Sequence, residues 1–396
     1  MLLNLLIFAA VAAASAILWW PRLRSSAIWR AMTTPLASII GSGFLVLGPI
    51  LTNAYGAYAP AVMAALCLGS YLLGGAIRYN MRAADARDAP WPDGIETVAS
   101  WALAFAYIVS VAYYLNLFGA FAVSLTRFDD PIFARSVTTA VYAIICGVGW
   151  TSGFRSLEAM EYLSVSIKLA IIAGLLVGLG FFFGDKAARG GLVFLETGVT
   201  GWGAITLGFG LIVTVQGFET SRYLGATYDT ETRVRSMKWA QWLSSAIYLT
   251  YILLIGFTFR RDQLAFSETA IVDMMGVITP ILPLLLVVAA LAAQFSAAVA
   301  DTSGSGGLMS ELSAGRIRPR AGYAILTATG VALTWATDVF RIISLASRAF
   351  AVYYALQCAV AALAAVRRGD RARAAGFGGL AILAASIAVF GQAVEG

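Results

Sequence analysis

The chain has 396 residues, of which 60% are hydrophobic and 12% charged, and its formal net charge is +6. A water-soluble domain does not carry so large an apolar fraction, so the composition excludes that class and indicates a polytopic helical membrane protein. The chain has no histidine, which excludes imidazole as a metal ligand or catalytic base. Its three cysteines each fall inside an apolar stretch, which argues against a disulfide framework.

Apolar stretches of about 20 residues, the length that crosses a bilayer as a helix, recur along the whole chain. The first is not expected to be a cleaved signal peptide, because no basic residues precede it and Trp19, Trp20 and Pro21 are typical of an interfacial anchor. We expect about twelve transmembrane helices, over residues 2–20, 33–55, 58–79, 96–125, 132–150, 157–183, 202–224, 239–259, 276–300, 322–338, 342–366 and 374–392.

The basic residues indicate how these helices are oriented. When the loop at residues 22–30 is placed in the cytoplasm, 18 Lys and Arg residues fall in inner loops and 7 in outer loops. This positive-inside bias predicts that both termini lie outside a bacterial-type inner (plasma) membrane. Because the bias accounts for the positive net charge, we expect the lipid bilayer as the surroundings and no nucleic-acid partner.

Glycines interrupt two of the apolar spans. Gly41, Ser42 and Gly43 lie inside the second span, and Gly217 lies 176 residues after Gly41, five spans further on. Each glycine costs a helix interior about 1 kcal/mol relative to alanine, and interrupted spans at matching positions in two halves are typical of inverted-repeat transporters. The expected fold is all-α, with an extra N-terminal helix and basic loop in residues 1–30, five-helix repeats in residues 31–184 and 201–366, and a C-terminal helix in residues 367–396.

Four segments resemble the amino acid–polyamine–organocation (APC) superfamily, which has a LeuT-type five-plus-five fold. Residues 39–44 (IIGSGF) are similar to the helix 1 signature of the family, and residues 216–219 (QGFE) are similar to its helix 6 pattern. Residues 153–169 resemble helix 5 with its frequent lysine, and residues 315–319 resemble the loop after helix 8. The resemblance covers residues 31–392 and implies a membrane transporter.

The first half of the expected substrate site is the backbone at the first break. Beyond Ile40, the freed N–H groups of Gly41, Ser42 and Gly43 stand at the start of a half-helix, where a carboxylate of a substrate is favourably bound. The alternative is a small-residue packing face between helices.

The second half of the expected site lies at the other break and consists of Val213, Thr214, Gln216 and Gly217. Unwound carbonyls there would accept a substrate ammonium, an arrangement that the resemblance also implies. The alternative is a kinked helix in which the Thr214 hydroxyl bonds to its own backbone. Tyr113 and Asn116 are candidates for the wall of the pocket, with ordinary packing as their alternative.

Lys168 is the candidate ion-coupling residue, because a lysine in the middle of an apolar span is expensive and such residues are functional by default. It is expected to act as a proton carrier or as a fixed charge, and the resemblance implies that it takes the place of the second sodium site. In sodium-coupled members of the family that this chain resembles, two adjacent Ser/Thr hydroxyls complete the ion site. Here Ser296 is followed by Ala297, so this pair is missing and sodium is disfavoured relative to protons. Asp301 would either neutralise Lys168 or lie solvated at the cytoplasmic mouth.

Three charged residues are candidates for gates. Arg348 lies deep in its span and would close an outer gate or pair with Asp338. Glu219 and Arg222 lie three residues apart, which predicts either a local ion pair or a gate.

Enzyme chemistry has no support in the sequence. The glycine-rich run at residues 304–307 lacks the lysine of a phosphate-binding loop, and neither a metal site nor a cofactor is expected. We expect a secondary transporter that moves an amino acid or related small amine by alternating access, coupled to protons or to no ion. One alternative is an inorganic-ion or metal transporter on the same fold. The other is a non-transporting membrane subunit or sensor, in which helix 2–20 would dock a partner.

Overall fold

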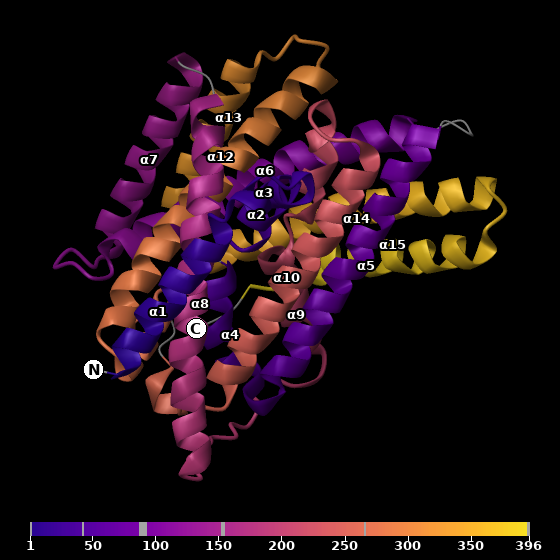
Figure 1. Cartoon of the computed structure of the whole chain (residues 1–396). Coiled ribbons are helices and arrows are strands. Elements are labelled where there is room, and N and C mark those ends of the chain that lie inside the picture. Colours follow the sequence, from indigo (N-terminus) through magenta and orange to yellow (C-terminus); the bar gives the residue numbers. More distant parts are fainter. Residues whose placement is uncertain (1, 42, 87–92, 152–154, 265–266, 394–396) are drawn as a thin grey trace.

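The computed structural model describes residues 2–41, 43–86, 93–151, 155–264 and 267–393, and every regular element within these residues is a helix (Figure 1). This agrees with the all-α prediction. An apolar chain in lipid has no water to satisfy its backbone, and a helix satisfies N–H and C=O groups within one segment.

The first half of the chain forms α1 (Leu2–Leu18), α2 (Pro21–Arg24), α3 (Ala27–Ile39), α4 (Gly43–Tyr55), η1 (Gly56–Tyr58), α5 (Ala59–Ala86), α6 (Asp93–Val123), α7 (Pro131–Thr151) and α8 (Arg155–Ala188). The second half forms α9 (Gly201–Gly210), η2 (Ile212–Val215), η3 (Phe218–Ala226), α10 (Thr230–Gly256), η4 (Arg261–Gln263), α11 (Ala270–Ile278), α12 (Ile281–Leu312), α13 (Pro319–Ala336), α14 (Val339–Arg367) and α15 (Arg371–Phe390).

Aspartates cap three of the helices in the second half. The side chains of Asp229, Asp338 and Asp370 accept backbone N–H groups at the starts of α10, α14 and α15. These bonds satisfy donors that the first turn of a helix leaves without a partner. At α10, the hydrogen bond from Thr232 N also holds the pKa of the exposed Asp229 below its usual value.

Eight helical segments of the described chain are long and apolar enough to cross a membrane. One of them, Gly43–Asp85, contains the end of one expected span and the whole of the next. The other expected spans correspond to α1, α13 and the helices that the two breaks divide. The expected total of about twelve therefore stays a prediction.

Helix α6 forms the centre of the bundle and packs against α7, α12, α13 and α14. In its most apolar stretch 72% of the residues are buried, against 28% in α7 and 11% in α15. The helix pair α14–α15 and the N-terminal α1 lie on opposite sides of the bundle in Figure 1. The two broken helices pack mainly against α5, α8, α10, α12 and α14.

The extra helix α1 packs along α8, and two glycines of α8 make room for it. A Cβ atom at Gly174 would lie 2.6 Å from Val11 Cγ2, and one at Gly178 would lie 3.2 Å from Ile7 Cδ1. Small residues four apart are a common way for membrane helices to approach closely. Helix α1 is therefore tied to the bundle, with Ile7 fully buried and Leu2 and Phe8 exposed on its other face.

Candidate functional site

The first predicted helix break lies between α3 and α4. Helix α3 ends at Ile39, and Ile40 leaves the helical conformation with φ −84° and ψ 61°. The second half-helix, α4, begins at Gly43, while Ser42 lies outside the described residues. Carbonyl groups at the end of α3 therefore lose their helical partners and need other donors.

The second predicted break follows α9. A short 3-10 turn, η2, leads to Gln216 in an extended conformation and then to Gly217 with φ +113°. Glycine is favoured at Gly217 because this φ is costly for any residue with a Cβ atom. The chain then resumes as η3.

The structure brings the two breaks into direct contact. A Cβ atom at Gly43 would lie 2.8 Å from Thr214 Cα, and one at Gly217 would lie 2.6 Å from Ser38 Cβ. At Gly41 the nearest atom would be Tyr114 Cε1, at 3.2 Å. The glycines therefore serve close packing of one break against the other, which the packing alternative predicted for Gly43.

Lys168 of α8 reaches the first break. Its Nζ atom donates hydrogen bonds to Ala37 O at 2.9 Å and Ile40 O at 2.7 Å, and the side chain is 1% exposed. The ammonium therefore lies among carbonyls that the helix break has freed. It does not extend towards the membrane surface.

Tyr248 of α10 joins the two breaks. Its Oη atom lies 2.9 Å from Ile39 O and 2.8 Å from Thr214 O, so that its single proton is shared between a carbonyl of each broken helix. The ring packs edge-on against Phe44 of α4, with ring centroids 5.5 Å apart. One buried side chain therefore contacts both parts of the expected site.

Side chains from α5 and α14 satisfy the backbone of the second break. Ser70 Oγ donates to Val215 O at 2.8 Å, while Ser347 Oγ donates to Gly210 O at 2.6 Å and accepts from Val213 N at 3.1 Å. Thr214 Oγ1 donates to Leu211 O at 2.5 Å, as the kinked-helix alternative predicted. The carbonyls expected to receive a substrate ammonium thus already accept hydrogen bonds from the protein.

Gln216 and Glu219 form a buried polar cluster with two tyrosines. Tyr354 Oη of α14 donates to Glu219 Oε2 at 2.9 Å, and Gly217 N donates to the same oxygen at 3.1 Å. Gln216 lies between Tyr354 and Tyr114, at 3.4 Å and 3.5 Å from their hydroxyls. This places Glu219 directly at the second break.

The predicted local ion pair between Glu219 and Arg222 is wrong. Arg222 Nη2 instead lies 2.5 Å from Glu96 Oε1 at the start of α6. Gln357 of α14 donates to both Glu96 oxygens at 3.2 Å, and Asn80 of α5 donates to Gln357 O at 2.9 Å. Arg222 therefore ties η3 to three other helices on the side that the charge bias predicts to be cytoplasmic.

The predicted pair between Arg348 and Asp338 is also wrong. Arg348 is exposed and its Nε donates to Ala388 O of α15 at 2.8 Å. Its expected part in an outer gate stays a prediction. Asp338 pairs with Arg341 at 3.3 Å. Arg341, in the first turn of α14, can reach Asp338 at the start of this helix. Arg348 lies almost two turns further along the helix, too far away to reach Asp338.

The remaining candidates lie in or against α6. Asn116 donates to Thr334 Oγ1 of α13 at 2.9 Å and so turns away from the breaks. Tyr113 is buried with its ring 5.1 Å from that of Tyr114. Ser296 Oγ donates to Ala293 O in its own helix. Asp301 is 1% exposed and contacts Ser110, so neither the solvated position nor an ion pair with Lys168 is found.

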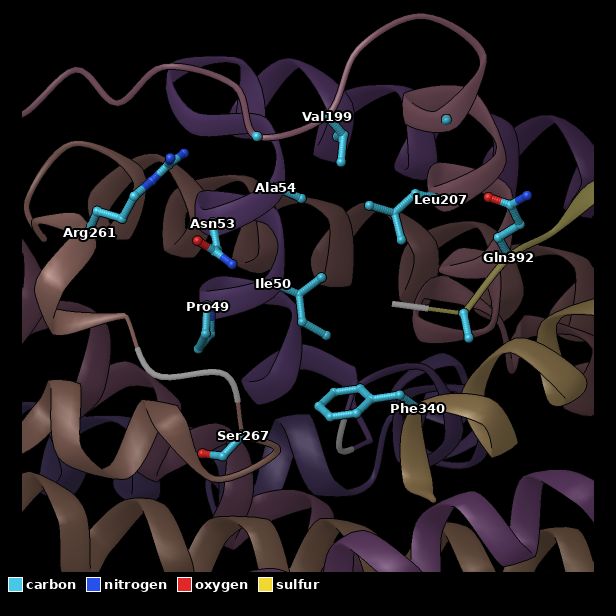
Figure 2. Close-up of a pocket in the computed structure, with 13 residues that line it drawn as sticks. Pro49, Ile50, Asn53, Ala54, Val199, Leu207, Arg261, Ser267, Phe340 and Gln392 are labelled. Carbon is cyan, nitrogen blue, oxygen red and sulfur yellow. The ribbon is translucent and has the colours of Figure 1, made fainter. Parts of the chain in front are cut away.

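A cavity of about 330 Å³ lies between α4, the second half of the first broken helix, and α9, the first half of the second, on the side predicted to face outward (Figure 2). Pro49 and Ile50 of α4, Leu207 of α9 and Phe340 of α14 form its apolar lining. Its polar lining residues are Asn53, Ser267, Arg261 and Gln392. The sequence analysis missed these residues, as it missed Tyr248, because polar groups in loops and hydroxyls in apolar spans are too common to single out.

Comparisons with known proteins show which family this chain belongs to. A family model described as APC superfamily transporter matches residues 21–391. An uncharacterized protein of Aquifex aeolicus (strain VF5) is 39% identical over 390 residues, which cover 95% of this chain and 93% of that protein.

Two solved transporters share the fold. A Na⁺-coupled sialic acid symporter in a substrate-bound outward-open state has a TM-score of 0.56 at 13% identity, over 100% of this chain and 99% of that chain. A nucleobase-cation-symport-1 family transporter, closed with bromovinylhydantoin bound, has a TM-score of 0.55 at 14% identity, over 91% of both chains. At these identities the likeness shows the fold alone.

Proposed function

This chain belongs to the APC superfamily of transporters and is a membrane transporter of the secondary type; on that premise we propose that it moves an amino acid or a related small amine by alternating access. We further propose that transport is coupled to protons or to no ion. The observation that carries the proposal is the contact between the two broken helices, with the Lys168 ammonium on the carbonyls of the first break.

The substrate site is proposed at these breaks, reached from the outer cavity. Gly43 begins α4, where the positive end of the helix dipole favours a carboxylate. Glu219, beside Gly217, supplies a buried acid on the opposite side of the break. The apolar lining of the cavity, with Arg261 and Asn53 among its polar residues, suits a small solute that carries both apolar and charged parts.

Lys168 supports coupling without sodium. A sodium ion needs several oxygen ligands, and in this chain the ammonium already takes up two carbonyls of the first break. On α12, Ser296 directs its hydroxyl to its own helix, and the side chain of Ala297 has no polar atom. The related sialic acid symporter is described as Na⁺-coupled. We propose that this chain replaces that ion with a fixed ammonium.

The test begins with binding because the substrate is unidentified. Purified protein is screened by thermal shift against amino acids, amines, nucleobases and salts, since a ligand at 100 times its Kd stabilises the native state by about 2.7 kcal/mol. Each ligand that raises Tm is then tested for counterflow in liposomes. Counterflow of an amino acid or amine supports the proposal. Counterflow of nucleobases alone refutes the substrate class, and no flux with any stabilising solute refutes transport.

Substitution of the buried lysine tests its role in transport. Lys168→Met removes the donor to two buried carbonyls, each of which costs about 1–3 kcal/mol when left unsatisfied, so counterflow is expected to fall at least about tenfold. Lys186→Met, in the last turn of the same helix, is the matched control and is expected to keep counterflow. Equal rates in the two variants would contradict the role of Lys168.

A further inference from the structure

Asp301 is a buried acid that has no cationic partner among the residues that the structure describes. It lies in α12 against α6 and is 1% exposed. Its Oδ2 atom contacts Ser110 Oγ, while Oδ1 has no hydrogen-bond partner among the described residues. None of the ion pairs within the described part of the chain includes Asp301.

The protons available at Ser110 bear on the state of Asp301. The Ser110 hydroxyl has one proton and also lies 3.0 Å from Tyr107 O, which can only accept. If Ser110 donates to Tyr107 O, the proton in the contact between Ser110 and Asp301 belongs to the carboxyl group. A protonated carboxyl is a donor, so this arrangement satisfies both contacts of Ser110. An ionised Asp301 would accept the hydrogen bond of the Ser110 hydroxyl, which would then not reach Tyr107 O. Its two oxygens would still share a single donor.

The surroundings of Asp301 oppose a negative charge. An ionised carboxylate in an apolar interior is very costly unless it is paired, and it becomes neutral instead. The charged group that acts on Asp301 is a second acid, Glu219 of η3, and its other titratable neighbours are Tyr107 and Tyr114 of α6. On α8, which also packs against α12, Lys168 is bonded to carbonyls of the first break.

Glu219 differs from Asp301 in its donors. One oxygen of Glu219 accepts from both Gly217 N and Tyr354 Oη, so two donors stabilise its carboxylate form. Asp301 has Ser110 alone. In each acid one oxygen has no hydrogen-bond partner among the described residues, so the difference lies in the other oxygen, where Glu219 has two donors and Asp301 has one. Asp301 therefore has less support for a negative charge than Glu219.

We propose that Asp301 and Ser110 form a proton-binding site between α12 and α6, in which the Asp301 carboxyl carries an exchangeable proton. The inference rests on the proposed transport function, since it assigns the coupling proton to this carboxyl. When the contact between the helices opens to water, the O–H bond of the carboxyl breaks and the proton passes to water, which leaves a carboxylate. Lys168, bonded to two carbonyls of the first break, has no part in this step.

Infrared spectroscopy of the purified protein in lipid tests the site without any substrate, because a protonated carboxylic acid has a C=O stretch distinct from that of a carboxylate. At neutral pH the wild type is expected to show this acid band, and Asp301→Asn is expected to lose it. Ser110→Ala is expected to keep the band and shift it to higher frequency, since its hydrogen-bond partner is gone. Transfer to D₂O is expected to lower the frequency as the proton exchanges. Asp273→Asn, at an exposed acid of α11, is the matched control and leaves the band unchanged.

Each other outcome overturns the proposal. An acid band that is absent from the wild type shows that Asp301 is ionised. A band that keeps its full intensity in Asp301→Asn shows that the proton is carried by another carboxyl group, such as Glu219. A band that never shifts in D₂O shows that the proton is not exchangeable. If Asp301→Asn fails to fold, Ser110→Ala decides alone, since an unshifted band excludes the contact. The band does not depend on flux, so an exchangeable Asp301 proton in a protein without counterflow would refute the proposed transport function and leave the proton site intact.

Discussion

The Tyr248 hydroxyl is expected to hold the two breaks together. The substitution Tyr248→Phe removes this hydroxyl and keeps the aromatic ring against Phe44. Ile39 O and Thr214 O share this donor, at 2.9 Å and 2.8 Å. A buried acceptor left unsatisfied costs about 1–3 kcal/mol, while side-chain hydrogen bonds between membrane helices contribute up to about 1.7 kcal/mol. A loss of about 1–2 kcal/mol raises the open fraction of the affected segments about 5- to 30-fold.

Tyr251→Phe is the matched control, because it removes a hydroxyl that serves one broken helix only. Tyr251 Oη donates to Leu45 O at 3.1 Å. In a regular helix that carbonyl would accept from the residue four positions later, but this residue is Pro49, which has no N–H. The control therefore also leaves a buried carbonyl unsatisfied, with a similar cost, but only within α4.

Hydrogen exchange read by mass spectrometry distinguishes the two variants. In Tyr248→Phe, peptides over residues 37–47 and 211–220 are both expected to exchange about 5- to 30-fold faster. In Tyr251→Phe the change is expected over residues 37–47 alone. If Tyr248→Phe changes only one segment, or if the two variants give the same pattern, Tyr248 does not couple the breaks.

Three further substitutions test contacts between separate elements of the fold. Gly217→Ala is expected to prevent a monodisperse protein on size-exclusion chromatography, because φ +113° and a contact with Ser38 at 2.6 Å leave no space for a Cβ atom, whereas Gly203→Ala, with no atom within 4 Å, is expected to be tolerated. Gly174→Leu is expected to separate α1 from α8 and lower Tm, and an unchanged Tm would refute their packing. Glu96→Gln weakens a mostly buried ion pair and is expected to cost about 1.5–3 kcal/mol in thermal unfolding, against less than about 1 kcal/mol for the exposed Glu231→Gln.

Both helix breaks were predictable from sequence because glycine in an apolar span is locally unfavourable. The spacing of the two breaks, five spans apart, also made it predictable that they form a pair. Lys168 was identifiable for a similar reason, since a charge in lipid has to be explained by a function or a partner. Each of these signals is a local violation of a rule.

Features that depend on partners far apart in sequence could not be predicted. Tyr248 looks like any other tyrosine in an apolar span. Nothing local shows that it contacts Ile39, which is 209 positions earlier, and Thr214, which is 34 positions earlier. Spacing suggested that Glu219 would pair with Arg222, but the crossing of η3, α6 and α14 gives each a different partner. Arg348 was expected to pair with Asp338 because its depth was read along the chain, whereas rotation around α14 places it on the exposed face against α15.

The sodium dependence of counterflow tests whether the Lys168 ammonium replaces a coupling sodium ion. Liposomes that contain the wild-type protein are loaded with the stabilising amino acid or amine, and exchange is measured in sodium and in potassium buffers. We expect equal rates in both buffers, because the Lys168 ammonium takes up two carbonyls of the first break. Counterflow that requires sodium would contradict this expectation.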